Sequence, residues 1–363
     1  EVRPFNVLHE DNISAGMRHR FTLPVRDNGH ITVGMEYFNE DYGFSTYETL
    51  EGGQTGSQIT HEAESRNYLN AFLQTEWTFG EKWYLFAGLN TAFTNLSNEE
   101  LKTNTPIAVF STAGISYSIL SDLLVSGSVS RGYSSLALED VLNADGMINP
   151  DIVPETGWSE ELSLKYFNDH GAFAKLTFFT MNIQNTVLTR RIMDDVFEKL
   201  NGGSSIHRGM EFEYKWISAS EKLSLDGAYT YSHFRFDEFV EGGVDHSGNQ
   251  LPGTPRHHVY TRFNLSPWRK WDFHIDYHLI SSVYLNDANT ATADGYQLIN
   301  AGIVYEIVSG KKWNGSISAN LHNLFHVQYS PMFQINAPGN QPRYYYPGKP
   351  RSLYLNMVFT HKI

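Results

Sequence analysis

Apolar and polar side chains alternate along the last stretch of the chain, residues 353–363. The odd positions include Leu353, Leu355, Met357 and Phe359, and the even positions between them are mostly polar. Because successive side chains of a β-strand point to opposite faces, this spacing predicts a strand with one apolar face and one polar face. A strand at the end of a sheet leaves an unpaired edge, and closure into a barrel removes that edge.

The same two-residue period recurs along the rest of the chain. Residues 12–23, for example, place Ile13, Met17 and Phe21 on one face and Arg18 on the other. Each such segment predicts one strand with two chemically different faces. The clearest segments are 12–23, 30–43, 67–79, 82–94, 106–119, 123–131, 158–166, 210–216, 272–279 and 353–363, and the segment 172–185 has the noisiest alternation.

The connections between the predicted strands alternate between short and long. The short ones are 24–29, 80–81, 120–121, 169–170, 218–220, 266–269 and 309–311. The long ones are 44–66, 95–104, 132–157, 186–203, 237–254, 285–295 and 323–350. Short turns on one side and long loops on the other are typical of outer-membrane barrels. The sequence therefore predicts an all-β fold, an antiparallel up-and-down transmembrane β-barrel, with about fifteen strands.

The odd strand number has a consequence for the barrel. Bacterial single-chain barrels have an even number of strands, and their short turns lie on the periplasmic side. If the last strand ends on that side, the first of fifteen strands begins outside the cell. We therefore expect the amino-terminal part of the barrel to be missing from this sequence, and the barrel to be open or incomplete.

Composition narrows the class of protein. Aromatic residues make up 14% of the chain and charged residues only 18%, yet the mean hydropathy is −0.37. Alternating strands produce this average, and no run approaches the roughly 18 apolar residues of a spanning helix. The net charge of −13 argues against nucleic acid, which needs clustered Lys and Arg. Cysteine is absent, and the first residues do not form a signal peptide.

Several motifs occur in a characteristic order from about residue 125 to the end. The main ones are Ser-Val-Ser-Arg-Gly-Tyr at 128–133, Asn-Pro-Asp-Ile-Val-Pro-Glu-Thr at 149–156, the Asn-Leu-Phe turn within 321–329, and Pro-Gly-Lys-Pro-Arg at 347–351. Weaker echoes lie at 209–213 and 251–258. In this order and spacing the motifs resemble those of the TonB-dependent outer-membrane receptors, although the chain ends on Ile363 where that family usually has an aromatic residue.

The resemblance implies that residues 1–363 are the carboxyl-terminal portion of a 22-stranded receptor barrel, without its plug domain. It implies a receptor in the outer membrane of a Gram-negative bacterium, embedded in outer-membrane lipid and inserted by the barrel assembly machinery. Its substrate would be a scarce nutrient complex, most often a ferric siderophore. Uptake would depend on the TonB–ExbB–ExbD complex, acting through the missing plug domain.

Candidate ligand-binding residues lie in two of the predicted long loops. Guanidinium groups pair with carboxylate and catecholate oxygens, and aromatic rings stack on an aromatic ligand. The alternative is that the aromatic residues belong to an interfacial girdle. The candidates are Arg190, Arg191, Phe333, Arg343, Tyr344, Tyr345 and Tyr346.

Other functions fit the sequence less well. Asp272, His274, Asp276 and His278 share one face of a strand, but residues two apart are about 6.6 Å apart, which is wide for one metal ion. We therefore expect polar residues lining the lumen, with no metal site and no cofactor. No motif brings a nucleophile and a base together, so we expect no catalytic residues and no enzyme. A passive, porin-like channel stays open as the main alternative to a receptor.

Overall fold

The structure is a computed structural model that describes residues 7–98, 102–104, 107–134, 136, 149, 152–193, 196–310, 312–337 and 345–361. Nearly all of the described secondary structure is β-strand, and a single 3-10 turn, η1, spans Glu51–Gly53. In these ranges no helix is long and apolar enough to cross a membrane. The all-β prediction is therefore confirmed.

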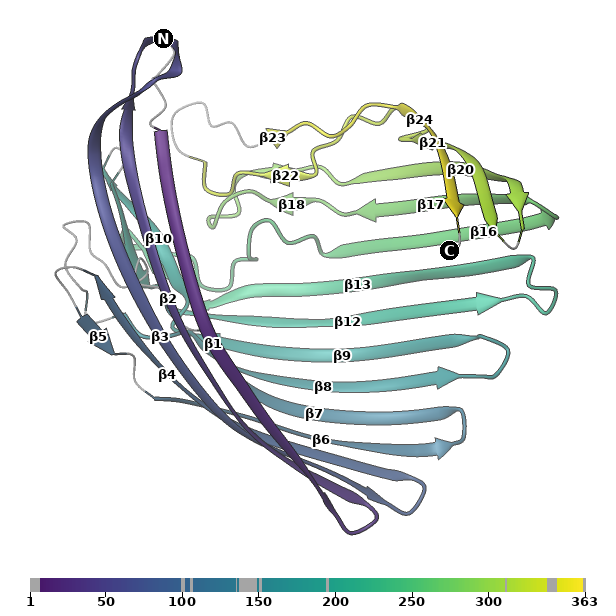
Figure 1. Ribbon diagram of the computed structural model, residues 1–363, viewed down its shortest axis with the longest axis horizontal. Helices are drawn as coiled ribbons and strands as arrows, with labels where there is room; N and C mark the ends of the chain where they lie inside the picture. Colours follow the sequence, from purple (N-terminus) through teal and green to yellow (C-terminus); the bar gives the residue numbers. More distant parts are fainter. Residues whose placement is uncertain are drawn as a thin grey trace. The chain divides into compact units, whose positions relative to one another are not determined.

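In the part of the chain that the structure describes, fifteen long strands follow one another in sequence order and form one antiparallel sheet, whose course Figure 1 shows. They are β1 (Val7–Val25), β2 (Gly29–Thr49), β3 (Thr55–Phe79), β4 (Trp83–Asn98), β6 (Ala108–Leu120), β7 (Leu123–Tyr133), β8 (Thr156–Phe167), β9 (Phe173–Gln184), β12 (Ser204–Ile217), β13 (Leu223–Glu238), β16 (His257–Trp268), β17 (Trp271–Ile280), β20 (Tyr296–Ser309), β21 (Trp313–His322) and β24 (Ser352–His361). In the described residues β1 and β24 each pair on one side only, so the sheet is not closed. The predicted strand number and open sheet are both confirmed.

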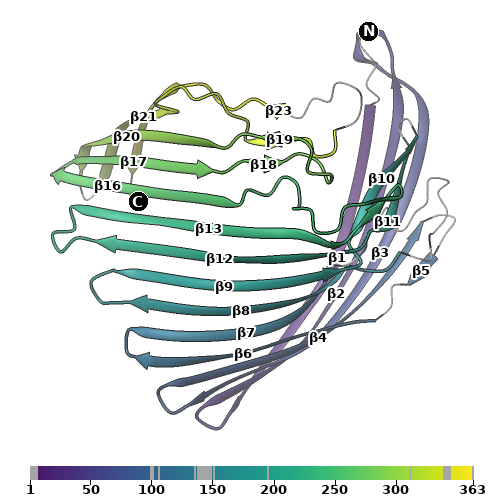
Figure 2. The same cartoon turned by 180° about the vertical axis from the view of Figure 1, so that it is seen from behind.

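The long connections carry short strands of their own. These are β5 (Lys102–Asn104), β10 (Val187–Met193), β11 (Val196–Asn201), β14 (Val240–Glu241), β15 (Val244–Asp245), β18 (Val283–Tyr284), β19 (Thr292–Ala293), β22 (Met332–Phe333) and β23 (Tyr345–Tyr346). β5 pairs with β4, and the others form two-stranded ladders. Figure 1 shows β18, β22 and β23 beyond one end of β17 and β20, and Figure 2 shows β18 and β23 there from behind. We call that end of the strands the long-loop end, and the other the short-turn end.

One predicted loop is wrong. Residues 44–66 are mostly an extension of the β2–β3 hairpin, which pairs from Gly29 with Trp77 out to Thr49 with Thr55. At 21 and 25 residues, β2 and β3 are about twice the length that a tilted strand needs to cross a bilayer. Beyond the bilayer both faces meet water, so the apolar alternation that marks a strand is lost while the backbone pairing continues.

The chain divides into two compact units. The first contains residues 1–115, 128–159 and 183–204, and the second contains residues 116–127, 160–182 and 205–363. In the first unit, the apolar face of β1 to β3 exposes Ile13, Met17 and Leu73. Its polar face carries cross-strand ion pairs, Arg18 with Glu36 and Arg66 with Glu40.

In the second unit the faces of neighbouring strands match across the sheet. Arg262 of β16 lies opposite Asp276 of β17, and Asp276 lies opposite Asn300 of β20. One residue along, Phe263 lies opposite Ile275, and these belong to an exposed apolar face. Apolar side chains thus remain exposed on one whole face, as expected where the solvent of that face is lipid.

Tryptophan gathers at the short-turn end of the strands. Six of the seven tryptophans lie at or next to a short turn, and they are Trp77, Trp83, Trp216, Trp268, Trp271 and Trp313. Trp271 packs against Tyr305 of the neighbouring strand, with 4.6 Å between ring centroids. Indole rings favour the boundary between hydrocarbon and headgroups, so in each unit these positions are typical of a membrane interface.

The two faces of β24 allow a matched test of lipid contact. Leu355 lies on the apolar face and Asn356, the next residue, on the polar face at nearly the same depth. We expect Leu355→Arg to destabilise the folded chain in lipid by about 2–4 kcal/mol, and Asn356→Arg by less than about 1 kcal/mol. Reversible denaturant unfolding in phospholipid vesicles measures both. Equal costs for the two variants would contradict the assignment of faces.

Candidate ligand-binding site at the long-loop end

A tight turn at Asn323 ends β21 and begins the last long connection. Asn323 is 3% exposed and has a φ of 51°, a left-handed conformation that Asn tolerates better than most residues. Its amide Oδ1 accepts a hydrogen bond from the Val327 backbone N–H, and its Nδ2 donates to the Val327 carbonyl, both at 2.8 Å. The Asn323 backbone N–H donates to Oδ1 of Asn300 at 2.9 Å. The side chain therefore closes the turn, and the backbone fastens it to β20.

The same side chain joins the turn to the end of that connection. Asn323 Nδ2 also donates to the Lys349 carbonyl at 3.2 Å, and the Gly348 N–H donates to the Tyr329 carbonyl at 2.8 Å. Any Cβ at Gly348 would overlap the Tyr329 ring, so this close approach requires glycine. The Asn-Leu-Phe and Pro-Gly-Lys-Pro-Arg motifs thus meet in space and position Tyr329 and Lys349.

A cavity of about 550 Å³ opens beside this junction. Its wall includes Tyr329, Phe333, Tyr345 and Lys349, with Asp294 from the connection before β20. The Phe333 and Tyr345 rings meet edge to face, with 5.9 Å between centroids, because the two residues pair across the β22–β23 ladder. The cavity combines aromatic surface with a cation, a combination that binds planar or anionic ligands.

A second cavity, of about 240 Å³, shares Tyr329 and Lys349 with the first. It lies over the polar face of the sheet. The residues that line it include His258, His278, Tyr296, Leu298, Asn300, His322 and Asn323, from β16, β17, β20 and the end of β21.

Three long connections of the second unit are fastened to one another around the larger cavity. A buried apolar cluster of Val283, Leu285 and Ala293 packs against Phe333 and Ile335. Beside it, the connection between β13 and β16 is tied to that between β17 and β20 by reciprocal hydrogen bonds. The Gln250 N–H donates to Asn289 Oδ1 at 2.8 Å, and Asn289 Nδ2 donates to the Gln250 carbonyl at 2.9 Å. We call these three connections the loop body.

Asp287 lies within the loop body, where it is partly buried. Its Oδ2 accepts a hydrogen bond from Asn336 Nδ2 at 2.7 Å, and its backbone N–H donates to Asn336 Oδ1 at 3.1 Å. Burial raises the pKa of the Asp287 carboxyl above its ordinary value, although the Asn336 hydrogen bond and nearby His246 act in the opposite direction. The carboxylate form is therefore less well accommodated than the neutral acid.

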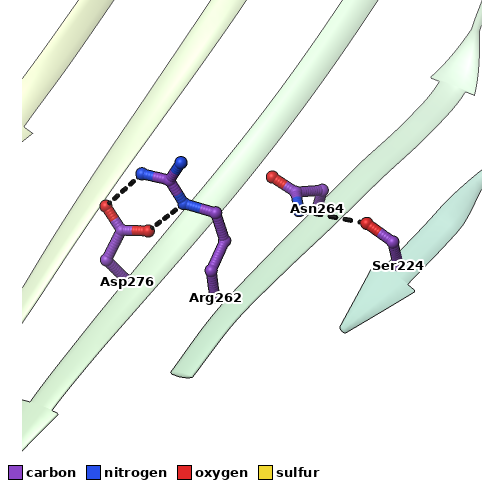
Figure 3. A network of polar contacts seen from close by, with 4 residues as sticks. All are labelled: Ser224, Arg262, Asn264 and Asp276. Atoms are coloured by element: carbon purple, nitrogen blue, oxygen red, sulfur yellow. Dashed lines mark hydrogen bonds and ion pairs between the residues drawn. The ribbon is translucent and has the colours of Figure 1, made fainter. Parts of the chain in front are cut away.

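The polar face below the cavities is paired internally (Figure 3). Arg262 Nε donates to Asp276 Oδ1 at 2.5 Å and Arg262 Nη2 donates to Asp276 Oδ2 at 3.0 Å, which forms a two-point ion pair between β16 and β17. Two residues further along β16, Asn264 Nδ2 donates to Ser224 Oγ of β13 at 3.0 Å. At this level the polar groups satisfy one another.

In the first unit, the motif at 149–156 is also tied to a neighbouring long connection. Glu155 Oε1 accepts a hydrogen bond from the Val187 N–H at 2.8 Å, and Asn201 Nδ2 donates to the Val153 carbonyl at 2.8 Å. Leu96, Leu136 and Ile152 form a small buried cluster next to Val187. Both described motif regions therefore act by fixing long connections to the sheet.

A family model described as "TonB dependent receptor-like, beta-barrel" matches residues 5–324. The chain belongs to the TonB-dependent receptor family. Members of this family lie in the outer membrane of Gram-negative bacteria, and this receptor is therefore an outer-membrane protein. The family and the matching structures are transport receptors, not enzymes.

Solved structures of other receptors share its fold. The ferric citrate transporter FecA matches with a TM-score of 0.79 at 17% identity, over 98% of this chain and 55% of that one. The ferric yersiniabactin receptor FyuA from Yersinia pestis matches with a TM-score of 0.74 at 16% identity, over 98% and 55% of the two chains. The copper transporter OprC matches with a TM-score of 0.76 at 12% identity, over 98% and 57%. The receptor chain thus spans about half the length of these structures.

The structure describes only some of the residues predicted to bind ligand. Phe333 and Tyr345 lie together in the wall of the larger cavity, and Tyr346 follows Tyr345 in β23. Arg343 and Tyr344 lie outside the described residues. Arg190 and Arg191 belong to β10, where their backbones pair with Glu198 and Phe197 of β11. The ligand contacts of all seven residues remain predictions.

The face of β17 that carries Asp272, His274, Asp276 and His278 is a polar face, and in the described ranges no group of three or more such side chains is arranged to hold a metal ion. Asp276 pairs with Arg262, and Asp272 Oδ1 accepts a hydrogen bond from Ser266 Oγ. Sequence reasoning missed His258 and His322 as neighbours of His278 in one cavity. The signal available was their position on the polar face at the long-loop end of their strands.

Replacement of Asn323 tests the junction of the two motifs. We expect Asn323→Ala to destabilise the receptor chain by about 2–3 kcal/mol, because it removes a buried amide and leaves backbone groups of Val327 and Lys349 without their partners. Hydrogen exchange at the Val327 amide should accelerate at the same time. Gln328→Ala, at an exposed position in the same turn, is the control and should change neither quantity. Unchanged protection of Val327 in the Asn323→Ala variant would contradict the role assigned to Asn323.

The raised pKa of Asp287 predicts that the loop body loses stability with increasing pH. A carboxyl whose folded-state pKa is raised stabilises the fold below its unfolded-state value, and this contribution is lost as pH rises through the folded-state pKa. We therefore expect Asp287→Asn to slow hydrogen exchange of residues 283–293 at neutral pH. In that variant the pH dependence of local opening should also become weaker.

Asp245 provides the matched control for Asp287. It lies at the exposed tip of the neighbouring connection, and hydrogen bonds from the Ser247 side chain and backbone hold its pKa below the ordinary value. Asp245→Asn should therefore not stabilise the loop body at neutral pH. If residues 283–293 exchange at the same rate in the Asp287→Asn variant and in the unmodified chain at every pH, the burial of the carboxylate does not affect the stability of the loop body.

Proposed function

We propose that the protein acts in TonB-dependent uptake of a scarce nutrient complex of the ferric siderophore class, and that the long-loop end faces the outside of the cell. Membership of the receptor family supports the uptake role. The cavity that joins the Phe333–Tyr345 ring pair to Lys349 supports a ligand with aromatic or anionic groups. The matching structures include receptors named for ferric citrate, ferric yersiniabactin and copper.

The same proposal assigns the remaining partners. The apolar face contacts outer-membrane lipid, and the barrel assembly machinery inserts the chain. Residues 1–363 form the carboxyl-terminal portion of the receptor barrel, and TonB–ExbB–ExbD engages a plug domain outside this sequence. Arg190, Arg191, Arg343, Tyr344 and Tyr346 contact ligand together with the ring pair. The chain carries no catalytic residues.

Binding of a chelate panel to the full chain tests the proposal. Ferric catecholate, hydroxamate and carboxylate chelates, and copper, are titrated against the chain in detergent micelles while tryptophan fluorescence is followed. We expect at least one chelate to saturate, and its uptake by cells that express the gene to require TonB. Stepwise ion conductance across planar bilayers, with no saturable chelate binding, would instead support the passive channel.

The ring pair supplies the residue-level test. We expect Phe333→Ala and Tyr345→Ala each to weaken chelate binding by about tenfold, because each removes a large aromatic contact from the cavity wall. Met332→Ala is the control, since Met332 neighbours Phe333 in β22 but does not line the cavity. If both aromatic variants bind the chelate with wild-type affinity, the assignment of the ligand site to this cavity is contradicted.

A further inference from the structure

Three histidines lie at the long-loop ends of three late strands. His258 of β16, His278 of β17 and His322 of β21 line the smaller cavity, together with Tyr329 and Lys349. They lie far apart along the chain and come together only through the register of the sheet. The aromatic pair used in the proposed function does not line this cavity.

The register explains how the imidazoles reach one cavity. Tyr260 lies opposite His278, and His258 lies opposite Ile280, so the two histidines are diagonal neighbours on one face. The Tyr260 and His278 rings are 4.9 Å apart between centroids. On the other side of β20, His322 meets Tyr354 edge to face at 5.2 Å. His278 and His322 are thus each supported by a tyrosine ring.

The spacing suits a large ligand better than a single metal ion. β17 and β21 are separated by β20, so His278 and His322 stand about two strand spacings, or roughly 10 Å, apart. Metal–imidazole bonds are only about 2.0–2.1 Å long, and the described side chains form no group that could hold a metal. An anion with several separated oxygens could reach two or three of the histidines at once.

Among the described residues that line the cavity, Lys349 is the only charged side chain when the histidines are neutral, and the Arg262–Asp276 ion pair lies below it. Arg262 of β16 and Lys349 are the cations. Asp276 of β17 and Asp226 of β13, which lies opposite Arg262, are the anions. The other titratable groups that face the site are tyrosines of β16, β20, β24 and the Asn323 turn, namely Tyr260, Tyr296, Tyr354 and Tyr329.

Protonation of the imidazoles adds positive charge to the cavity wall. A histidine can gain its charge between about pH 8 and pH 5, and each imidazolium then has two N–H donors. Each histidine that takes up a proton therefore adds one positive charge beside Lys349. Among the described residues, no carboxylate lines the cavity itself to neutralise that charge.

We propose that this histidine cavity is a pH-dependent subsite for polyanions that bear several carboxylate or comparable oxygens. It rests on the proposed function in one respect: the polyanion is the chelating part of a nutrient complex that first meets the adjoining aromatic cavity. Tyr329 and Lys349, which line both cavities, connect the two sites. The subsite holds the chelate more tightly as the medium becomes acidic.

Calorimetry with ethane-1,2-disulfonate on the full chain in detergent tests the subsite. This probe keeps two negative charges across the whole range, so any pH dependence comes from the protein. We expect binding at about pH 5.5 to be at least about tenfold tighter than at about pH 8, because protonated imidazoles attract the dianion. Dimethyl sulfone, a neutral probe with similar oxygens, should show no such change.

A triple variant, H258Q/H278Q/H322Q, should bind the disulfonate equally at both pH values. H170Q, in the short turn between β8 and β9, is the control and should keep the full pH dependence. If circular dichroism shows that the triple variant is misfolded, H322Q alone serves, since His322 is exposed, and it should reduce the pH dependence measurably. Equal binding of the probe at both pH values by the unmodified chain, or pH dependence retained in the folded histidine variants, overturns the proposal.

The design separates this inference from the proposed function. The disulfonate carries no metal and no ring, so F333A/Y345A should leave its binding unchanged while weakening chelate binding. If the chain binds a chelate but shows no pH-dependent binding of the disulfonate, the receptor function is supported and the histidine subsite is contradicted. If the chain binds the disulfonate in a pH-dependent way but binds no chelate, the anion subsite is supported and the proposed uptake of a chelate is contradicted.

Discussion

The constraint on which the structure depends is that a backbone in hydrocarbon must satisfy its own hydrogen bonds while presenting an apolar face to lipid. Antiparallel pairing of consecutive strands meets the first requirement, and strict alternation meets the second. Ile275 and Phe263 are exposed on one face of β17 and β16, whereas Asp276 and Arg262 pair on the other. A soluble protein with so much exposed apolar surface would aggregate. Here the same surface is the part that membrane insertion requires.

Because alternation fixes the faces, it also fixes where a binding site can form. Midway along β16 and β17 polar side chains bind one another, as the ion pair of Arg262 and Asp276 shows. At the long-loop end the strands stop, and the chain turns back over the polar face. Asn323 makes that return specific by holding both Val327 and Lys349. The two cavities lie beside this junction and share its residues.

The sequence was most informative where lipid imposes a pattern. The strand number and the faces followed from the two-residue period, and the noisy segment 172–185 is strand β9 as expected. The period failed at residues 44–66, where β2 and β3 pair beyond the bilayer and no solvent difference marks their faces. Phe333 and Tyr345 could be predicted as ring-bearing loop residues. Their mutual contact could not, because it depends on the β22–β23 pairing of two separate segments of the loop.

The histidine cavity shows why motif reading stops short of a site. The sequence places His278 among four polar residues on one face of its own strand, for which it predicts a lumen-lining position and no metal site. Its neighbours in the cavity are on other strands, and the register between β16, β17 and β20 decides that His258 joins it while His274 lies further down the same face. A one-residue slip of that register would turn His258 towards lipid. The apolar face sets the register of the strands, because a slipped register would turn apolar side chains away from lipid. The lipid-facing residues therefore determine where the imidazoles on the opposite face lie.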